Sequence, residues 1–556
     1  MRQRHGRQHL FILALTFTIA TVALTWPLSP QLWDHVVDAR IYGASGAWWR
    51  QDIFLNLWIL SWGTHALTTA PLQMWNGNVL VPMNQALAGS EHMLGYQALF
   101  APLYLLSDNP VFATQVLALL SFVLTGVAMA LLARELTGSA MAGWLAGCVL
   151  AFSPWRFNEL TRVQLLATFY LPLIVLCLSR YLRLGNRHYL FALSGLLAMQ
   201  TLTSFYLGYF AFLTIGLLLL PSLLTRALTA RQWRAIAAAV GSAAVLVAPM
   251  SLPYLRLRAS GVIPNDPYEQ PMAISFLLAA EPWRRFFMPG TELYLGVTTL
   301  ALSVLGCRRL GIEMWPGRAA LLTLAAGGYI LTQGPAWPIG AIMIPLPYRI
   351  LGWFVPGMSA VRYPLRFGIL VILAVALLAA RGSVRMMHLV GARPNVRRLV
   401  ALGLTIAIIF EGRRFPGAHL RLETVPVGAA VPAVYLWLRI HGEGGVCVEI
   451  PVGDDSFPGF QRESRYMYFS TYHWLPLVNG FTGYPAREST ELRTVARRLP
   501  DPGALTMLRE RAKVRWVVVH HAELDAATEL IWQAAEPAWR KVAEFGDDRV
   551  FDVGQG

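Results

Sequence analysis

The sequence has little lysine and few charged side chains for its length. Of its 556 residues, 46 are Lys or Arg, and only Lys513 and Lys541 are lysines. Charged residues make up 14% of the chain and hydrophobic residues 55%, whereas a typical soluble protein has roughly 25% charged residues. This balance argues against an ordinary soluble domain. The formal net charge of +15 therefore comes almost wholly from arginine.

Cysteine is also scarce, and several catalytic motifs are missing. Cys148, Cys177 and Cys307 lie within or at the end of apolar segments, and Cys447 stands alone near the C-terminus. Without a CxxC pair or a Cys/His zinc spacing, we expect neither disulfides nor a structural metal. The sequence also lacks a Walker loop, a DxD sugar-nucleotide motif and a Ser-His-Asp spacing, so no ATP or nucleotide-sugar site is expected. We predict no cofactor; a divalent metal is compatible with the sequence, but no acidic cluster demands one.

What is present is a series of long apolar segments from Leu10 to about Phe410, which is typical of a polytopic membrane protein. The first segment is long for a signal peptide and has no small-x-small cleavage site, so we interpret it as a retained span. Eleven spans are predicted, at about residues 10–30, 111–132, 140–152, 165–182, 189–204, 205–224, 235–252, a segment ending at Arg308, a segment beginning at Arg318, 367–380 and 399–410.

The position of the arginines predicts the orientation of the chain. Arg2, Arg4 and Arg7 precede the first span, and almost every loop assigned to the inside is rich in arginine. This places the N-terminus in the cytoplasm and, after eleven spans, the C-terminus outside. Because the arginines lie in short loops between spans, we do not expect nucleic-acid binding.

The loop between the first two spans, residues 31–110, is too polar to be a span but is rich in Trp, Leu and Met. From Leu55 to Ala66 the apolar residues recur at helical spacing, which predicts a helix in the plane of the membrane interface. Trp58 and Trp62 would then lie at the depth of the lipid headgroups. The opposite face is polar and carries Asn56, Ser61, Thr64 and His65.

Acidic residues are few in the part of this loop from Trp48 to Pro102. Asp52 stands at the head of the predicted helix, where it is either a functional carboxylate or a helix N-cap, and the sequence leaves both open. Glu91 lies further along, beside His92, whose imidazole would tune the proton affinity of the Glu91 carboxyl. Asp52 and Glu91 are therefore the candidate catalytic residues, and His92 is a candidate substrate-binding residue.

After Gly412 the sequence changes character. Apolar runs shorten to strand length at 446–452, 475–481 and 514–521, and helical stretches lie between them. This alternation predicts a C-terminal extracytoplasmic α/β domain over residues 413–556, after a transmembrane domain over residues 1–412. The chain is predicted to end in a hairpin with Asp547 and Asp548 at its turn. His520 and His521 follow a strand, and we interpret them as a solvated edge.

Seven arginines are predicted on the outer side, against the positive-inside trend: Arg156, Arg162, Arg284, Arg285, Arg349, Arg362 and Arg366. Each one alone is compatible with snorkelling to lipid headgroups. Together they predict a pocket for a phosphorylated lipid, because guanidinium groups bind phosphate oxygens in pairs. Arg362 and Arg366 are four residues apart and would share the first turn of the tenth span. Tyr206 and Tyr209 are interpreted as packing residues.

These features resemble the GT-C membrane glycosyltransferases, which include the protein O-mannosyltransferases and the bacterial aminoarabinose transferase. The chain is more closely similar to a group of bacterial GT-C-like multi-pass proteins. The stretches that carry the resemblance are DIFLNLWILSW, SEHMLGYQALFAPLYLLSDNP, AFSPWRFNELTRVQLLATFYLP, PGMSAVRYPLRFG and YMYFSTYHWLPLVNGFTGYP. The shared pattern is a first span, a long outer loop with Asp near its start, many further spans and an outer C-terminal domain.

The resemblance implies transfer of a sugar from a polyprenyl-phosphate-linked donor to a lipid, glycan or protein acceptor at the outer face of the bacterial cytoplasmic membrane. It assigns the loop-one Asp, here Asp52, as the base or acceptor-binding carboxylate. Many members have a second acid beside it, whereas the neighbours here are Gln51 and Ile53. In the tail, Tyr472 and His473 lie in an aromatic, polar stretch without an adjacent acid, and we expect them to orient the acceptor.

Two other functions are compatible with the sequence. A lipid-linked glycan transporter, or flippase, would need polar residues at mid-membrane depth, but the span centres are nearly free of charge. A non-catalytic cell-envelope assembly protein with the same fold is the other alternative. The low charge of the span centres favours chemistry at the outer membrane face over transport.

Overall fold

The computed structural model describes residues 2–42, 49–263, 282–308, 315–339, 342–355, 357–358, 361–391, 393–412 and 420–554. The chain packs as two compact units. The first comprises Met1–Ser29, Val116–Leu255 and Pro264–Leu420, and the second comprises Pro30–Gln115, Arg256–Ile263 and Arg421–Gly556.

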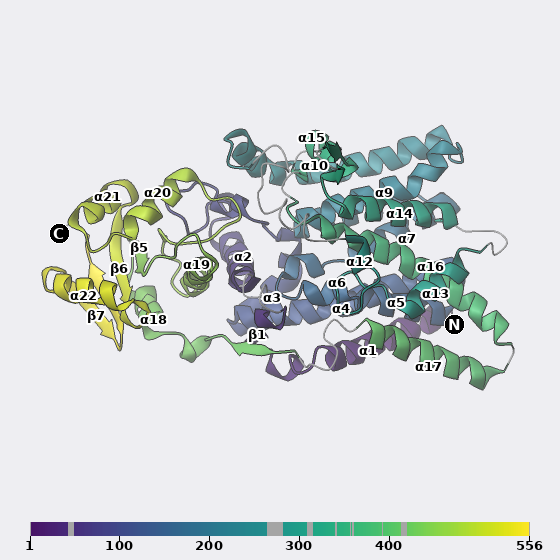
Figure 1. Ribbon diagram of the computed structural model, residues 1–556, viewed down its shortest axis with the longest axis horizontal. Coiled ribbons are helices and arrows are strands. Elements are labelled where there is room, and N and C mark those ends of the chain that lie inside the picture. The colour runs from purple at the N-terminus through teal and green to yellow at the C-terminus, as the bar shows by residue number, and fades with distance from the viewer. Residues whose placement is uncertain are drawn as a thin grey trace. The chain divides into compact units, whose positions relative to one another are not determined.

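Each of the eleven predicted spans corresponds to a helix (Figure 1). These helices are α1 Arg2–Leu24, α4 Pro110–Thr137, α5 Ala140–Ala151, α7 Tyr170–Leu184, α8 His188–Thr203, α9 Phe205–Leu224, α10 Ala230–Ala259, α13 Val297–Gly306, α14 Arg318–Thr332, α16 Gly368–Leu389 and α17 Pro394–Glu411. Among the described residues, five helical segments are long and apolar enough to cross a membrane: 110–137, 163–184, 205–224, 230–259 and 364–389. The prediction of a helical membrane protein is confirmed, and the number of eleven crossings stays a prediction.

Helix α16 forms the centre of the first unit. It is buried along nearly its whole length and packs against α5, α13 and α14. A Cβ added at Gly382 would collide with the carbonyl oxygen of Leu302, and one added at Gly306 would collide with that of Leu378. The backbones of α13 and α16 therefore touch, and glycine at these two positions permits a contact that is common between membrane helices.

Short elements connect these helices within the first unit. They are α6 Pro154–Asn158, η7 Val163–Leu166, α12 Pro282–Arg285, α15 Pro347–Phe354, η10 Pro364–Phe367 and the antiparallel strands β2 Ala336–Ile339 and β3 Ile342–Pro345. Several arginines that the sequence predicts on the outer side lie on or beside these short elements.

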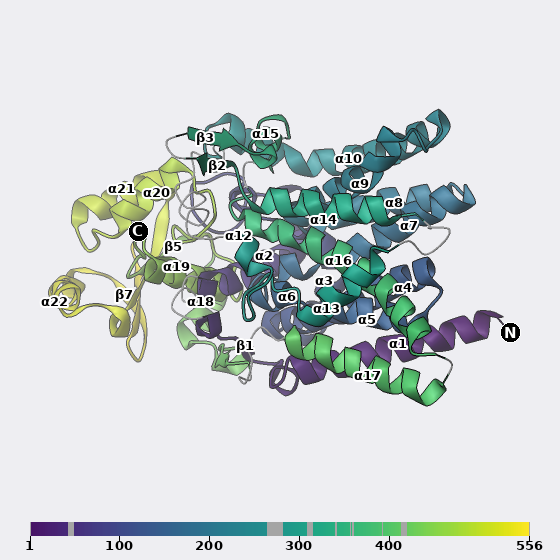
Figure 2. The same ribbon diagram turned by 45° about the vertical axis from the view of Figure 1, so that its right-hand side comes forward.

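The second unit combines helices with a small mixed sheet (Figures 1 and 2). Its helices are α2 Arg50–Thr69, α3 Gln97–Ser107, α18 Ala433–His441, α19 Phe457–Ser470, α20 Arg487–Ala496, α21 Pro502–Ala512 and α22 Ala526–Ala535. The strands β5 Val446–Ile450, β6 Val514–His520, β8 Asp548–Asp552 and β7 Lys541–Phe545 lie in that order, with β5 and β6 parallel and the other pairs antiparallel. Strand β1 His35–Val37 pairs separately with β4 Leu422–Thr424.

The predicted strands in the tail have different outcomes. The strands near 446–452 and 514–521 and the terminal hairpin are confirmed. Segment 475–481 is not a strand, because only Leu477 forms a β-bridge, to Cys447. Its backbone instead bonds to residues 78–81 of the first loop as well as to Cys447. The predicted boundary after Gly412 adjoins residues outside the described part of the chain, so a separate C-terminal domain stays a prediction.

Helix α2 confirms the helical periodicity but not the predicted exposure. Asn56, Ser61 and Thr64 on its polar side are buried, as is Trp58 on its apolar side. Thr64 Oγ1 donates a hydrogen bond to Gln97 Oε1 on α3 over 2.8 Å. The predicted exposure of this polar side is therefore wrong, because Asn56, Ser61 and Thr64 are buried inside the second unit. A helix in the plane of the membrane interface, with Trp58 at headgroup depth, stays a prediction.

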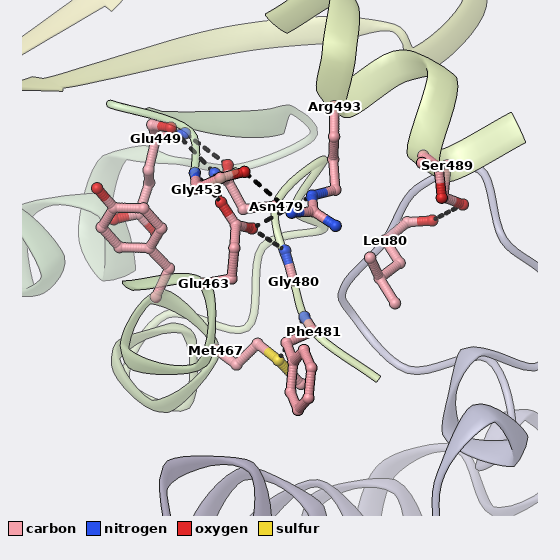
Figure 3. A network of polar contacts seen from close by, with 12 residues as sticks. Leu80, Glu449, Gly453, Glu463, Met467, Asn479, Gly480, Phe481, Ser489 and Arg493 are labelled. Atoms are coloured by element: carbon pink, nitrogen blue, oxygen red, sulfur yellow. Dashed lines mark hydrogen bonds and ion pairs between the residues drawn. The ribbon is translucent and has the colours of Figure 1, made fainter. Parts of the chain in front are cut away.

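A buried carboxylate, Glu463 on α19, joins several loops of the second unit (Figure 3). It accepts hydrogen bonds from the backbone N–H groups of Gly453, at 2.7 Å, and Gly480, at 2.5 Å. Arg493 on α20 lies 3.7 Å from the same carboxylate. Burial raises the pKa of Glu463, and the charge of Arg493 and the hydrogen bonds from Gly480 and Gly453 oppose that rise. The pairing of a buried charge explains why Glu463 and Arg493 are tolerated here.

His520 is buried, so the predicted solvated edge is wrong. Its Nε2 atom lies 3.1 Å from Glu449 Oε2, and its Nδ1 atom lies 2.7 Å from Asp548 Oδ1. Burial alone would lower the pKa of His520, but the two carboxylates raise it to about 9. The sequence misses this ion triad because Glu449, His520 and Asp548 lie on three separate strands, β5, β6 and β8.

This arrangement predicts how stability depends on pH. The pKa of folded His520, about 9, exceeds the ordinary value of 6.5, so the stability contributed by its charge is complete below 6.5 and is lost as pH rises through 9. Neighbouring Tyr435 and Tyr466 stay neutral in this range, because burial raises their pKa values. Hydrogen exchange of the β6 segment, corrected for intrinsic rates, should accelerate over that interval.

In a His520→Gln variant this pH-dependent part of the exchange should disappear. The exposed His441 on α18 provides the matched control, and His441→Gln should keep the pH dependence of the unmodified protein. Equal pH dependence in the His520→Gln variant and the unmodified protein would contradict the assignment of a charged, doubly paired His520.

Candidate functional site

Two of the predicted phosphate-binding arginines meet at one buried carboxylate of the first unit. Glu159, directly after α6, is 1% exposed. Arg162 Nη1 lies 2.8 Å from its Oε2 atom, and Arg366 Nε lies 3.5 Å from its Oε1 atom. Glu159 was not among the predicted site residues, although it stands in the stretch AFSPWRFNELTRVQLLATFYLP, three residues before Arg162. Its carboxylate holds two guanidinium groups from distant segments next to each other.

Arg366 and Arg362 both contact Tyr206, but in different ways. The Arg366 guanidinium lies 5.0 Å from the centre of the Tyr206 ring, and the backbone N–H of Arg362 donates to the Tyr206 hydroxyl over 3.1 Å. The prediction that the two arginines share the first turn of a helix is wrong, because α16 begins only at Gly368. Pro364 starts the 3₁₀ turn η10 that carries Arg366, and Arg362 precedes that turn in non-helical chain.

A second buried carboxylate lies next to this group. Glu292 forms an ion pair with Arg285, and the hydroxyl of Tyr363 lies 3.5 Å from Glu292 Oε1. The ring of Tyr363 is in turn 5.6 Å from the Arg366 guanidinium. We use the name arginine cluster for six residues: Glu159, Arg162, Arg285, Glu292, Tyr363 and Arg366. Its three arginines exceed its two carboxylates by one charge, an excess that suits an anion.

Arg156 has a different environment. It is fully buried, and its guanidinium donates to the carbonyl oxygens of Ala151, at 3.1 Å, and Leu166, at 2.7 Å. It also bonds to the hydroxyls of Ser121, at 2.9 Å, and Thr168. These bonds join α4, α5 and the segment before α7. The substrate contact predicted for Arg156 stays a prediction, and this set of internal acceptors does not favour it.

The remaining arginines of the first unit that are predicted on the outer side lie near tryptophan rings. Arg349 on α15 is half-buried, and its guanidinium lies 5.1 Å from the ring centre of Trp353. Arg284 on α12 is exposed and lies 6.0 Å from the ring centre of Trp283. Cation–π contacts of this kind are compatible with a substrate role for Arg349 and equally with placement beside lipid headgroups.

Asp52 of the second unit lies in the first turn of α2 and is half-buried. The helix N-cap is Trp49, which makes no side-chain capping bond. The alternative reading of Asp52 as the N-cap is therefore wrong, since Asp52 stands three residues after the cap. A carboxylate in the first turn is still favoured by the helix dipole.

A bidentate ion pair fixes the start of α2. Arg50 Nε lies 3.0 Å from Glu423 Oε1, and its Nη2 atom lies 2.9 Å from Glu423 Oε2. Glu423 belongs to β4 and pairs with Val36 of β1. Asp38, just after β1, accepts hydrogen bonds from the Arg40 side chain at 2.9 and 3.0 Å. Although burial opposes it, these bonds hold the pKa of Asp38 below its ordinary value. The sequence analysis missed these ion pairs.

The other predicted residues of the loop are Glu91 and His92. Glu91 is half-buried, and His92 is buried with its ring perpendicular to Trp75, 5.5 Å between centres. His92 Nδ1 accepts a hydrogen bond from the backbone N–H of Leu94 over 3.0 Å. Burial lowers the pKa of His92 to about 3. A neutral His92 does not support the expectation that its charge tunes Glu91.

Tyr472 and His473 follow α19 in the second unit. Tyr472 is half-buried, and its hydroxyl lies 3.1 Å from that of Tyr468. His473 Nδ1 accepts from the backbone N–H of Leu475 over 3.0 Å, and its ring is parallel to that of Tyr435 at 6.1 Å. Burial lowers the pKa of His473 to about 3, so it too is neutral at physiological pH. Their role in orienting an acceptor stays a prediction.

Among the described residues, the structure contains no group of three or more His, Cys, Asp or Glu side chains that could hold a metal ion. The expectation that no metal is needed stays a prediction. The candidate residues of the two units are instead arginines, carboxylates, tyrosines and the two buried histidines His92 and His473. Such groups can bind an anion and exchange a proton.

No protein-family model and no curated protein matches the sequence. Among solved structures, the arabinofuranosyltransferase AftD from Mycobacteria aligns with 99% of this chain at 15% identity and a TM-score of 0.58. One class of a mutant AftD gives a TM-score of 0.61 at the same identity and coverage of this chain. The chain spans only 40% and 42% of the length of these two AftD chains.

The archaeal oligosaccharyltransferase AglB from Archaeoglobus fulgidus, in complex with an inhibitory peptide and a dolichol-phosphate, aligns with 97% of this chain and 73% of its own at 12% identity. Its TM-score of 0.41 is too low to establish a shared fold. The similarity to AftD does establish one, and it agrees with the sequence stretches that resemble the superfamily. The chain shares the fold of the AftD arabinofuranosyltransferase structures.

Proposed function

We propose that the protein is a membrane glycosyltransferase that moves a sugar from a polyprenyl-phosphate-linked donor to a lipid, glycan or protein acceptor at the outer face of the cytoplasmic membrane. The observation that carries the proposal is the arginine cluster. It gathers guanidinium groups around two buried carboxylates in a chain that shares the fold of AftD. The arabinofuranosyl transfer named for AftD gives further support.

The arginine cluster has the chemistry that a phosphate leaving group needs. In the proposed reaction an acceptor oxygen attacks the anomeric carbon, and the bond from that carbon to the donor phosphate breaks. Negative charge then builds up on the phosphate, and positioned guanidinium groups stabilise it. Arg162 and Arg366 are oriented by Glu159 before any ligand binds, so little side-chain entropy is lost when they bind phosphate oxygens. The donor already carries its leaving group, so no nucleotide is required.

The same reaction needs a base that takes the acceptor proton as the new bond forms. We assign this role to Asp52. Asp52 is half-buried in the first turn of α2. The Arg50–Glu423 ion pair fixes the backbone two residues away, which limits the movement of Asp52. Glu91 is the alternative base in the same loop.

Substitution of Asp52 by Asn tests the assigned base. Asn keeps the shape of the side chain but cannot take the proton, so the transfer rate should fall by about 10²- to 10⁴-fold, with donor binding unchanged. The measurement is sugar transfer by the purified protein in lipid nanodiscs, with a panel of pentose and hexose polyprenyl phosphates as donors.

Asp108→Asn is the matched control, because Asp108 ends α3 in a left-handed conformation that Asn also adopts readily. This variant should transfer sugar at the unmodified rate. If Asp52→Asn also retains that rate, the base role passes to Glu91 and Glu91→Gln becomes the test. If neither substitution slows transfer in an active preparation, the proposed base is absent from this loop.

Substitution of Arg366 tests phosphate binding. Arg366→Ala should weaken binding of the donor by about 2 kcal/mol, which is roughly 30-fold, because a charge-assisted bond in a poorly solvated site is lost. Glu159 keeps Arg162 as its partner in this variant. Arg366→Lys should restore only part of the affinity, since an ammonium group cannot bind two oxygens in a fork.

The readout is the dissociation constant for an unreactive polyprenyl phosphate, measured by native mass spectrometry in nanodiscs. Arg362→Ala tests the second arginine of the predicted pair in the same way. Arg284→Ala is the control, because Arg284 is exposed and lies outside the arginine cluster. Equal losses in the Arg284 and Arg366 variants would assign both residues to general contact with lipid headgroups.

A further inference from the structure

The second unit contains a cavity that includes none of the residues assigned to sugar transfer. Its volume is about 130 Å³, and it lies among α18, α19, the end of β6 and the start of β8. Tyr435, Tyr466 and Phe469 line it and are buried. Since one water molecule occupies roughly 30 Å³ of liquid, the space exceeds what a single ordered water would fill.

The aromatic lining is held rigidly before any ligand binds. Tyr435 stacks on Phe469 with 4.5 Å between ring centres and 14° between planes. Tyr466 stacks on His520 at 5.5 Å and 18°, and its hydroxyl donates to the carbonyl oxygen of Pro451 over 3.1 Å. Side chains fixed in this way lose little entropy when a ligand contacts them. Aromatic walls with a few placed polar groups are typical of small-molecule sites.

The polar groups of the cavity form two sets. Arg462 Nε lies 3.2 Å from Glu523 Oε2, and Arg465 Nη1 lies 3.5 Å from Glu523 Oε1. The other set is His520 with Asp548, behind which lies Glu449. Arg465 and Ala522 are the exposed members, so solvent reaches the cavity beside them.

The charges of these groups balance when Glu449, which pairs with His520 but does not line the cavity, is counted with them. The cations are Arg462, Arg465 and His520, and the carboxylates are Glu449, Glu523 and Asp548. A site for phosphate or for a metal cation would carry an excess of one sign, as the arginine cluster does. Here the donors and acceptors are paired guanidinium, imidazole and carboxylate groups, and they lie beside aromatic side chains. Such a lining suits a sugar ring, which presents hydroxyl groups at its edge and C–H groups on its face.

We propose that this cavity binds one neutral sugar residue. The ring face would cover the aromatic lining, and the hydroxyls would bond to Arg465, Glu523 and Asp548. The volume admits a single residue, so the ligand would be the end or a branch of a glycan. This glycan-binding role does not depend on the proposed transfer reaction, because it needs no donor phosphate and no base.

Binding is tested on the full-length protein in lipid nanodiscs, with neutral methyl glycosides of hexoses and pentoses as probes and saturation-transfer NMR as the readout. Ala522→Trp places a large side chain at the exposed edge of the cavity and should weaken binding at least about tenfold. Ala526→Trp is the matched control, since Ala526 is exposed on α22 and does not line the cavity. It should change the affinity by less than about twofold.

A second variant, Arg465→Leu, covers the case in which the tryptophan disturbs folding, because Arg465 is exposed and its removal leaves Arg462 paired with Glu523. It should weaken binding at least about threefold. Asp108→Asn, at a position with no assigned role, should bind the glycosides normally. The proposal is overturned if no methyl glycoside in the panel binds, if inorganic phosphate binds in their place, or if binding is unchanged in the Ala522 and Arg465 variants.

Discussion

The second unit depends on the side-chain amide of Asn78, which is buried and fully used. Its oxygen accepts a hydrogen bond from Trp58 Nε1 over 2.8 Å, and its nitrogen donates to Ser470 Oγ and to the carbonyl oxygen of Leu475, both at 3.1 Å. A buried amide that loses a partner costs roughly 1–3 kcal/mol. Helix α2, the loop that follows it and the end of α19 must therefore stay in register. The helix that carries Asp52 is thus held by a residue 392 positions after Asn78.

Buried charge imposes the same kind of constraint on the first unit. Glu159 is almost fully buried and would be strongly destabilising without Arg162 and Arg366. An anion that binds these arginines meets groups already brought together to satisfy a carboxylate. The folding requirement and the proposed binding role therefore favour the same arrangement. Arg156 differs, because its guanidinium donates hydrogen bonds to backbone carbonyl oxygens instead of to a carboxylate.

The sequence predicts the helices well because an apolar segment long enough to form a span is a local property. It predicts the partners of polar residues poorly because these are set by contacts between distant segments. Thr64 looks like part of an exposed face until Gln97 is placed against it. His520 looks like the solvated end of a strand until Glu449 and Asp548 flank it.

The candidate sites follow the same rule. The sequence points to Arg162 and Arg366 because arginines predicted on the outer side run against the usual charge bias, which is again a local signal. It missed Glu159, since the partner of that carboxylate in η10 is far away along the chain. The sequence predicted the helix that begins near Asp52. It did not predict the Arg50–Glu423 ion pair, because that pair requires β4 to return beside the start of α2. Pro364 is the exception, because its effect on the preceding backbone could have ruled out a shared helical turn for Arg362 and Arg366.

The two proposed sites differ in charge as their proposed ligands do. In the arginine cluster one cation exceeds the carboxylates, whereas at the cavity of the second unit, with Glu449 counted, the cations and carboxylates cancel. Electrostatic attraction would therefore bring a phosphate-bearing lipid to the first site and would give no such advantage at the second. A neutral sugar residue would be retained at the second site by aromatic contact and paired hydrogen bonds. The difference in net charge would by itself keep a phosphate-bearing lipid and a neutral sugar residue at separate proposed sites, because each site lacks the feature that the other ligand requires.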